Sequence, residues 1–222
     1  MNSKCWYKDV CTNECTTTCQ RFIEMDFLFE NSGIPEGKRF LEKLQAIPED
    51  YNSYLRLQDI KNDIFYFVQK GKNIYITSEN TGNGKTTWAL KLLMKYFDEV
   101  WAGNGLRVRG MYVHVPTLLL QLKNFQNPLS DSYKQNLMNC DLVVWDDIAV
   151  SGISQYDYSN LLMFIDSRIM NEKSNIFTSN ILNSNDMSKI LGSRLSSRIF
   201  NTSEIIIFRG KDRRYDTVAD NQ

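Results

Sequence analysis

The stretch NIYITSENTGNGKTT, residues 73–87, decides how this chain folds. Its first five residues form a β-branched and aromatic run that is typical of a short buried strand. A turn with two glycines follows, and from Thr86 to Phe97 apolar residues recur at helical spacing. A strand, a glycine-containing turn and Gly-Lys-Thr at the start of a helix together predict a phosphate-binding loop. We therefore expect an α/β fold with a nucleotide site at this turn.

The predicted loop consists of Thr81, Gly82, Asn83, Gly84, Lys85, Thr86 and Thr87. Glycines let the backbone turn its N–H groups toward the phosphates, and the helix N-terminus adds partial positive charge. Lys85 is expected to reach the β- and γ-phosphates, and the Thr86 hydroxyl to ligate Mg²⁺. The usual motif has a further glycine where this chain has Glu79. The alternative is a chance Gly-Lys-Thr in a loop, and the flanking strand and helix favour the phosphate site.

The composition is that of an ordinary globular protein. The chain has 222 residues, of which 42% are hydrophobic and 23% charged. That is enough for one α/β domain with a small appendage, or for two small domains. The formal net charge of zero excludes a generic polyanion binder, so any nucleic-acid contact has to come from a local patch. The first residues are polar and no stretch reaches the roughly 18 apolar residues of a membrane span, so we expect a cytoplasmic protein with no membrane partner.

Strand and helix patterns alternate along the chain. Further strands are expected at residues 110–115, 141–145, 175–178 and 204–208. Helices are expected at residues 38–47, 54–69, 86–97, 116–124, 156–170 and 188–200, and residues 21–29 form an amphipathic stretch. Such alternation predicts a central parallel sheet flanked by helices on both faces.

An acidic pair follows a second apolar run, LVVWDD at residues 142–147. The carboxyl end of a buried parallel strand is where open α/β sheets bind their ligands. Asp146 is expected to hold Mg²⁺, directly or through water, and Asp147 to activate the attacking water as general base. The alternative is that the two aspartates cap the segment that follows.

Polar residues near the chain's end suggest further parts of the site. Asn180 follows the strand pattern at residues 175–178 and is expected to orient water as a sensor, although alone it would be a turn residue. Arg194 and Arg198 are four apart on one helix face, where they could stabilise transferred phosphoryl charge or be solvated or salt-bridged. Residues 189–214 carry seven Lys/Arg and two acidic residues. This excess suits a subunit interface at a nucleotide or a nucleic-acid patch.

Four cysteines occur within the first twenty residues, at Cys5, Cys11, Cys15 and Cys19. Four thiolates are enough for a tetrahedral Zn²⁺ site that would fold a segment without a core. An iron–sulfur cluster and free or redox-active thiols are the alternatives. The remaining Cys140 is expected to be a small core residue.

Two other polar features are expected to be structural. His114, the only histidine, falls in the strand pattern at residues 110–115 and is expected to be buried with its hydrogen bonds satisfied. Arg107 and Arg109 fall in a glycine-rich loop that we expect to be solvated, with DNA contact as the alternative.

With its motifs in this order, the chain resembles the bacterial and phage replicative-helicase loaders of the DnaC/DnaI type, a branch of the AAA+ ATPases. The resemblance covers about residues 55–214 and rests on TGNGKTT, GMYVHVPTLLLQL, LVVWDDI, TSN, LGSRLSSRI and GKDRR. It implies that Arg198 is an arginine finger and Arg214 a sensor-II-like arginine, with no C-terminal helical lid after it. Glu79 and the residues 148–150 depart from the family's pattern, which weakens the expected rate of catalysis more than nucleotide binding.

The resemblance also implies a function. We expect a slow, partner-stimulated ATPase that associates with itself through its ATP sites and loads a DnaB-type replicative helicase onto single-stranded DNA. Residues 1–50 would form a zinc-binding module that engages the helicase, and residues 51–222 the AAA+ domain, in a protein of phage or mobile-element origin. The alternatives are a transposition-type AAA+ ATPase that regulates a transposase, a small-molecule kinase, and a non-hydrolysing partner-binding module.

Overall fold

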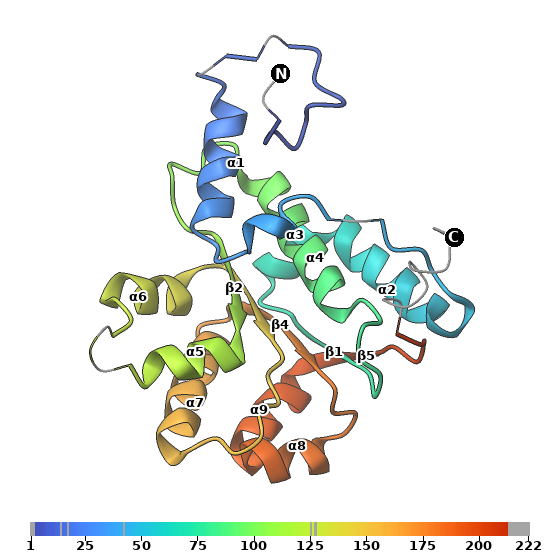
Figure 1. Ribbon diagram of the computed structural model, residues 1–222, viewed down its shortest axis with the longest axis vertical. Coiled ribbons are helices and arrows are strands. Elements are labelled where there is room, and N and C mark those ends of the chain that lie inside the picture. Colours follow the sequence, from blue (N-terminus) through green and yellow to red (C-terminus); the bar gives the residue numbers. More distant parts are fainter. Residues whose placement is uncertain are drawn as a thin grey trace.

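The computed structural model describes residues 3–13, 15–16, 18–41, 43–124, 126 and 128–212. Within them, five parallel strands form one sheet in the order β2-β3-β4-β1-β5. The strands are β1 (Asn73–Thr77), β2 (Gly110–His114), β3 (Leu142–Asp146), β4 (Ser174–Ser179) and β5 (Ser203–Ile207). The strand that precedes the phosphate loop, β1, therefore lies between β4 and β5, with neighbours on both sides (Figure 1).

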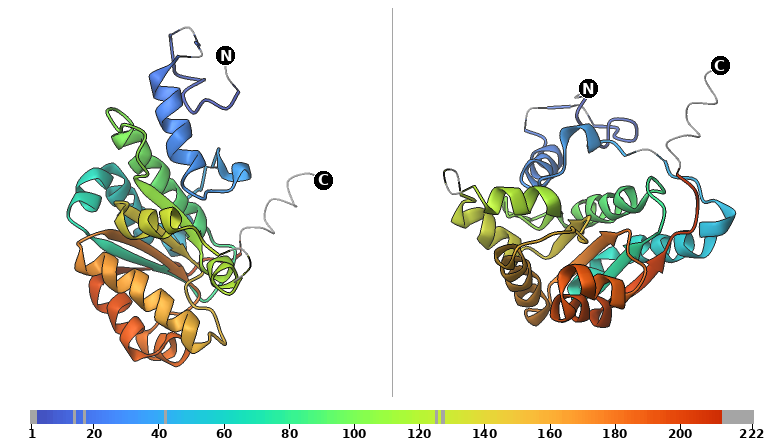
Figure 2. Two further views of the ribbon diagram at one scale, coloured as in Figure 1. Left: turned by 90° about the vertical axis from the view of Figure 1, so that its left-hand side faces the viewer. Right: turned by 60° about the horizontal axis from the view of Figure 1, so that its bottom comes forward.

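Helices cover both faces of this sheet (Figures 1 and 2). One face carries α1 (Gln20–Glu30), α2 (Tyr51–Asn62), α3 (Ile64–Gln69) and α4 (Lys85–Val100). The other carries α5 (Val115–Leu122), α6 (Asp131–Asn139), α7 (Gln155–Met170), α8 (Ser184–Leu191) and α9 (Ser193–Thr202). The predicted α/β class, a central parallel sheet flanked by helices, is confirmed.

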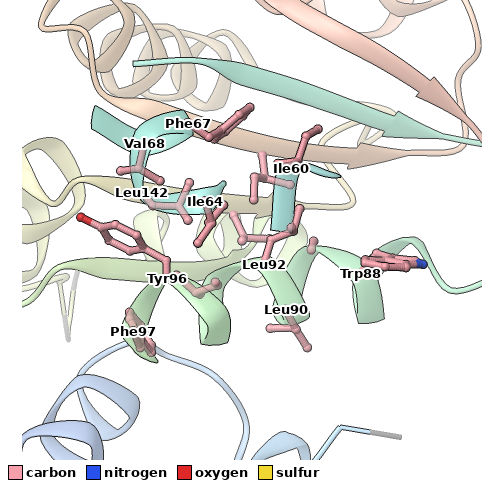
Figure 3. Packing of buried hydrophobic residues seen from close by; sticks show 14 of the residues in the cluster. Ile60, Ile64, Phe67, Val68, Trp88, Leu90, Leu92, Tyr96, Phe97 and Leu142 are labelled. Carbon is pink, nitrogen blue, oxygen red and sulfur yellow. The ribbon is translucent and has the colours of Figure 1, made fainter. Parts of the chain in front are cut away.

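Successive strand residues point to opposite faces and build two separate cores. Ile74 and Ile76 of β1 pack with α4, whereas Tyr75 between them packs with the helices of the other face. Figure 3 shows the first core, where side chains of α2, α3 and α4 meet Leu142 of β3. Because both faces of the sheet are covered, the central strands β1, β3 and β4 are buried along their whole length.

The helix predicted at residues 38–47 is wrong. The 3-10 helix η1 (Glu36–Lys38) ends where it should begin, and residues 43–47 have no regular structure. Residues 43–50, which we call the strap, instead run past the phosphate loop and end in η2 (Pro48–Asp50). A methyl group added to Gly84 would come 3.1 Å from Leu44 Cδ1. These tertiary contacts outweigh the local helical preference, which is worth less than about 1 kcal/mol per residue.

Three other helical predictions need adjustment. The single helix expected at residues 54–69 is split into α2 and α3 at Asp63, whose backbone leaves the helical region. The helix expected at residues 188–200 is split into α8 and α9 at Gly192, which has φ of 77°. Helix α6 was not predicted, although Ser130 caps it by accepting a hydrogen bond from the Tyr133 N–H at 3.1 Å.

The N-terminal segment packs onto α1 and α4 through aromatic residues. The Trp6 ring lies 5.6 Å from the Phe29 ring of α1, and its indole N–H donates to the Arg39 carbonyl at 3.1 Å. The Tyr7 hydroxyl donates to Asp98 of α4. Buried residues of α1 share one hydrophobic core with α4. The division into residues 1–50 and 51–222 stays a prediction.

No helix within the described ranges combines the length and the hydrophobicity that crossing a membrane requires.

Candidate nucleotide site

The carboxyl ends of the parallel strands bring the predicted site residues to one edge of the sheet. His114 at the end of β2 is in register with Asp146 at the end of β3. Thr77 at the end of β1 is in register with Ser179 at the end of β4. Ligands of open α/β sheets bind beyond this edge, and the loop that follows β1 is the predicted phosphate loop.

The loop's backbone is shaped for an anion. Gly82 and Gly84 have φ of 67° and 99°, a left-handed conformation that costs other residues about 1–2 kcal/mol. Helix α4 starts at Lys85, directly after the second glycine, and no side chain of a described residue caps its first turn. Uncapped N–H groups and the helix dipole favour a phosphate at this position.

The Lys85 side chain is held within the loop by neutral acceptors. Its amino group donates to the Asn80 carbonyl at 2.9 Å and to Asn83 Oδ1 at 3.2 Å. Asn83 in turn donates to Ser78 Oγ, and both side chains are buried. The ammonium group is therefore positioned by residues of the loop itself, close to the glycines that would surround a phosphate.

The Asp146 carboxylate is the buried centre of the site and is held by three hydroxyl groups. Thr86 and Thr178 donate to Oδ1 at 2.8 and 2.7 Å, and Tyr112 donates to Oδ2 at 2.8 Å. The contact with Thr86 connects the loop to β3, although sixty residues separate the two in sequence. A hydroxyl and a carboxylate in contact are the hard oxygen ligands that Mg²⁺ prefers, so these residues fit the cation that the motif implies.

Asp147 turns outward next to this centre. Its φ of 53° lies in the left-handed region, which aspartate tolerates better than most residues, and its N–H donates to Thr178 Oγ1 at 3.0 Å. Burial and the Asp146 charge raise the pKa of the Asp147 carboxyl group, and the charges of His114 and Lys85 oppose that rise. Its side chain is 53% exposed, so water can reach it.

Asn180 and Asp147 line the same pocket. This pocket measures about 300 Å³ and lies between the chain after β3 and the chain after β4. Asn180 itself is exposed, and the neighbouring Ser179 is buried. The structure thus brings the predicted sensor and the predicted general base together, in a pocket large enough for water.

The strap and the end of the described chain lie beside the loop. Asp50 Oδ1 accepts hydrogen bonds from the N–H groups of Arg209 and Gly210 at 2.6 and 3.0 Å. Asn80 donates to the Gly210 carbonyl at 3.1 Å, and Thr81 donates to Asp212 at 3.2 Å. The GKDRR motif therefore begins against the phosphate loop, while Arg214 lies outside the described residues.

The two helical arginines are paired within the chain. Asp166 of α7 binds Arg194 at 3.2 Å and Arg198 at 2.6 Å. The Arg198 side chain is still 38% exposed. The two arginines thus form the salt bridges expected under the structural alternative, and the Arg198 side chain remains partly exposed to solvent.

The four N-terminal cysteines are not brought together. Cys5 is buried, Cys19 is half-buried, and Cys11 and Cys15 are exposed. Among the described residues, no group of three or more Cys, His, Asp or Glu side chains is placed to hold a metal ion. The structure does not support the predicted zinc site. Trp6 and Tyr7 attach this segment to the rest of the protein.

Several residues of the site were missed or misjudged from the sequence. Tyr112 and Thr178 belong to the stretches GMYVHVPTLLLQL and TSN, but the sequence did not indicate that their hydroxyl groups hold Asp146. His114 was expected to be buried, but its side chain is 41% exposed and its Nε2 lies 3.8 Å from Asp147 Oδ2. Its place at the end of a parallel strand could have indicated this. Arg109 is held by Asp141 and Tyr96, whereas Cys140 is buried as predicted.

Several solved structures share this fold. The structure resembles the DnaC helicase loader, with a TM-score of 0.63 and 21% identity over 75% of this chain and 93% of that one. It resembles DnaI, with a TM-score of 0.61 and 17% identity over 85% and 93%. It also resembles AMPPCP-bound DnaA from Aquifex aeolicus, with a TM-score of 0.56 and 15% identity over 80% of this chain and 52% of that one. At such identities the likeness establishes the shared fold alone.

Sequence comparison carries the assignment further. No curated protein matches the chain, but residues 53–215 match the model of the family described as IstB-like ATP binding protein. The matched range includes the phosphate loop, Asp146, Asp147 and both helical arginines. The chain therefore belongs to the family of IstB-like ATP binding proteins.

Proposed function

We propose that this protein hydrolyses ATP and uses it, within a cytoplasmic assembly, to load a DnaB-type replicative helicase onto single-stranded DNA. The observation that carries the ATPase part is the contact between Thr86 and Asp146, with Asp147 exposed beside it. Phosphoryl transfer to water requires oxygen ligands for Mg²⁺, a carboxylate that water can reach, and a phosphate loop with a lysine. These groups lie side by side in this site.

Each residue has one task in this proposal. Lys85 and the N–H groups that begin α4 bind the phosphates, and Thr86 and Asp146 hold Mg²⁺. The bound cation would neutralise charge that develops on the phosphoryl oxygens. Asp147 accepts a proton from the attacking water, for which its raised pKa makes it a stronger base. Asn180, in the same pocket, orients that water.

Arg198 and Arg214 complete the site in the assembly. Arg198 would act on ATP bound to a neighbouring copy, and its partial exposure on α9 supports that role. In such an arrangement an isolated chain turns ATP over slowly, because its own site lacks the arginine of a neighbour. Partners that bring copies together would raise the rate.

The loading activity is supported by the fold it shares with the DnaC helicase loader. A transposition-type AAA+ ATPase remains the alternative, and one observation favours it. The four cysteines, whose clustering argued for a loader with a zinc module, are not gathered. The partner therefore has to be decided by experiment.

The test is a binding experiment with purified full-length protein. The chain is mixed with ATP, single-stranded DNA and replicative helicases from candidate hosts, and complexes are separated by size-exclusion chromatography. We expect an ATP-dependent complex that includes the helicase. A chain that turns over ATP but binds none of these helicases would overturn the loader proposal while leaving the ATPase proposal intact.

A further inference from the structure

A second hollow lies away from the nucleotide site. This pocket measures about 440 Å³ and is lined by Trp6 and Tyr7, by residues of α1, α2 and α4, and by residues 39–41 and 43. Its volume falls within the range of about 300–1,000 Å³ that is typical of binding pockets. Its α4 residues begin at Lys91, six positions beyond Lys85 and hence about 9 Å along the helix axis. The proposed ATPase chemistry makes no use of it.

The lining of this pocket includes apolar and aromatic side chains. Met25, Leu41 and Met94 are its aliphatic members. Methionine side chains adapt to differently shaped apolar groups and are common at peptide-binding surfaces. Phe40 also lines the pocket and has 49% of its surface exposed, a large fraction for a ring that borders a hollow. An apolar side chain from outside would bury this surface.

The lining is strongly cationic. Among the described residues, it contains Arg39, Lys43, Lys61, Lys91 and Lys95, with Asp98 as the one acid. Arg39 is already engaged by Asp26, Glu30 and Glu36, and Lys95 by Asp98 and Glu99. Within the described part of the chain, Lys43 and Lys61 have no carboxylate at ion-pair distance. Two amino groups at the rim are therefore available to bind an acidic partner.

We propose that this pocket binds an acidic segment of a partner protein. One large apolar side chain of that segment enters between Leu41 and Met94, and flanking carboxylates bind Lys43 and Lys61. An apolar centre with a charged rim is the usual anatomy of a protein docking site. The lining's excess of cations matches an acidic and not a basic segment.

Other occupants fit less well. Single-stranded nucleic acid binds by stacking bases on free aromatic faces, but Arg39 lies 4.5 Å from the Trp6 ring and Lys8 lies 5.1 Å from the Phe40 ring. A small polar ligand needs several fixed hydrogen-bonding groups. The indole N–H of Trp6 and the hydroxyl of Tyr7 already donate within the protein.

The experiment uses the full-length chain and fluorescein-labelled peptides made of glutamate and aspartate around a single leucine, phenylalanine or tryptophan. Binding is followed by fluorescence anisotropy. Peptides with alanine at the centre and an oligothymidylate of equal charge are the comparison probes. We expect binding by at least one acidic peptide with a large apolar centre, weaker binding with alanine, and no displacement by the oligonucleotide.

Variants locate the site. The double substitution Lys43→Glu and Lys61→Glu should weaken binding about tenfold or more, because two favourable charge pairs become repulsive. The same charge change at Lys70 and Lys134, outside the pocket, should alter it less than about twofold. A peptide with lysines in place of the acids should bind the Lys43/Lys61 variant better than it binds the wild type.

The proposal is overturned if no acidic peptide binds, if both double variants weaken binding equally, or if the oligonucleotide displaces the peptide. Asp147→Asn separates this proposal from the ATPase proposal. That variant should bind the peptide like the wild type, whatever its rate of ATP turnover.

Discussion

Thr178→Val tests whether the hydroxyl groups around Asp146 hold the centre of the nucleotide site. Thr178 is buried, and its hydroxyl donates to Asp146 Oδ1 at 2.7 Å and accepts from the Asp147 N–H at 3.0 Å. Valine keeps the shape and removes both hydrogen bonds. The carboxylate loses one of three hydroxyl donors, and the Asp147 N–H group loses its acceptor.

The magnitude follows from these two bonds. A hydrogen bond to a charged group contributes about 1.5–3 kcal/mol and a neutral one about 0.5–1.5 kcal/mol. Thr86 and Tyr112 still hold Asp146, so we expect the free energy of unfolding to fall by about 2–4 kcal/mol. With an m-value of about 1–3 kcal/mol per molar urea, the unfolding midpoint should fall by roughly 1 M or more.

Urea unfolding followed by circular dichroism measures this loss, and Thr178→Ser is the matched control. Serine keeps the hydroxyl and loses one methyl group, which costs about 1 kcal/mol. The reasoning would be refuted if the Thr178→Val variant were as stable as the Thr178→Ser variant, because the two hydrogen bonds would then contribute nothing measurable to the free energy of unfolding. A large change in m-value would instead indicate an altered unfolded or native state.

Three further predictions follow from the same structure. Arg168 is fully buried and donates hydrogen bonds to backbone carbonyls at 2.7–2.8 Å. Arg168→Met should therefore lower the free energy of unfolding by about 3–5 kcal/mol. An unchanged melting temperature would contradict this. Burial opposes ionisation of Asp141, but the hydrogen bond and charge of Arg109 prevail and hold the pKa of that carboxyl group below its usual range. This stabilisation is present above the unfolded pKa of about 3.9 and is lost as the pH falls through the folded pKa, so urea unfolding between about pH 6 and pH 2 should show a shallower loss for Asp141→Asn. Gly84→Ala should weaken binding of a fluorescent ATP analogue at least about tenfold, because alanine is strained at φ of 99° and its methyl group would lie 3.1 Å from Leu44 of the strap. Gly103→Ala is the control: no atom lies within 4 Å of the added methyl group, and binding should not change.

The central strands and the helix after β1 could be predicted from the sequence, because the residues within each element indicate its structure. The apolar runs at β1 and β3 can only be buried strands between helices, and Gly84 and Lys85 mark where the helix after β1 starts. The acidic pair at the end of β3 could be placed beside that loop, since parallel strands align their carboxyl ends.

Tertiary contacts explain what sequence patterns missed. The apolar spacing of the strap predicts a helix. In the fold, however, Leu44 lies beside Gly84, and Asp50 accepts a hydrogen bond from the backbone after β5. The contacts of Thr178 and Tyr112 with Asp146 could not be predicted, because only the folded sheet brings their hydroxyl groups to that carboxylate. The number of cysteines near the start of the sequence predicted a metal site. Their spacing along the sequence does not determine where the side chains lie in the fold, and within the described residues the thiols form no metal-binding group.

ATP turnover by Asp147→Asn, measured beside the wild type, tests the proposed chemistry most directly. Asparagine tolerates the φ of 53° at this position and keeps the side chain's size, so the fold and nucleotide binding should be preserved. We predict that a fluorescent ATP analogue binds both proteins equally and that turnover of the variant falls by about a hundredfold or more, as expected for loss of a general base. Equal turnover by the two proteins, or a wild type that binds no ATP, would contradict the proposed site.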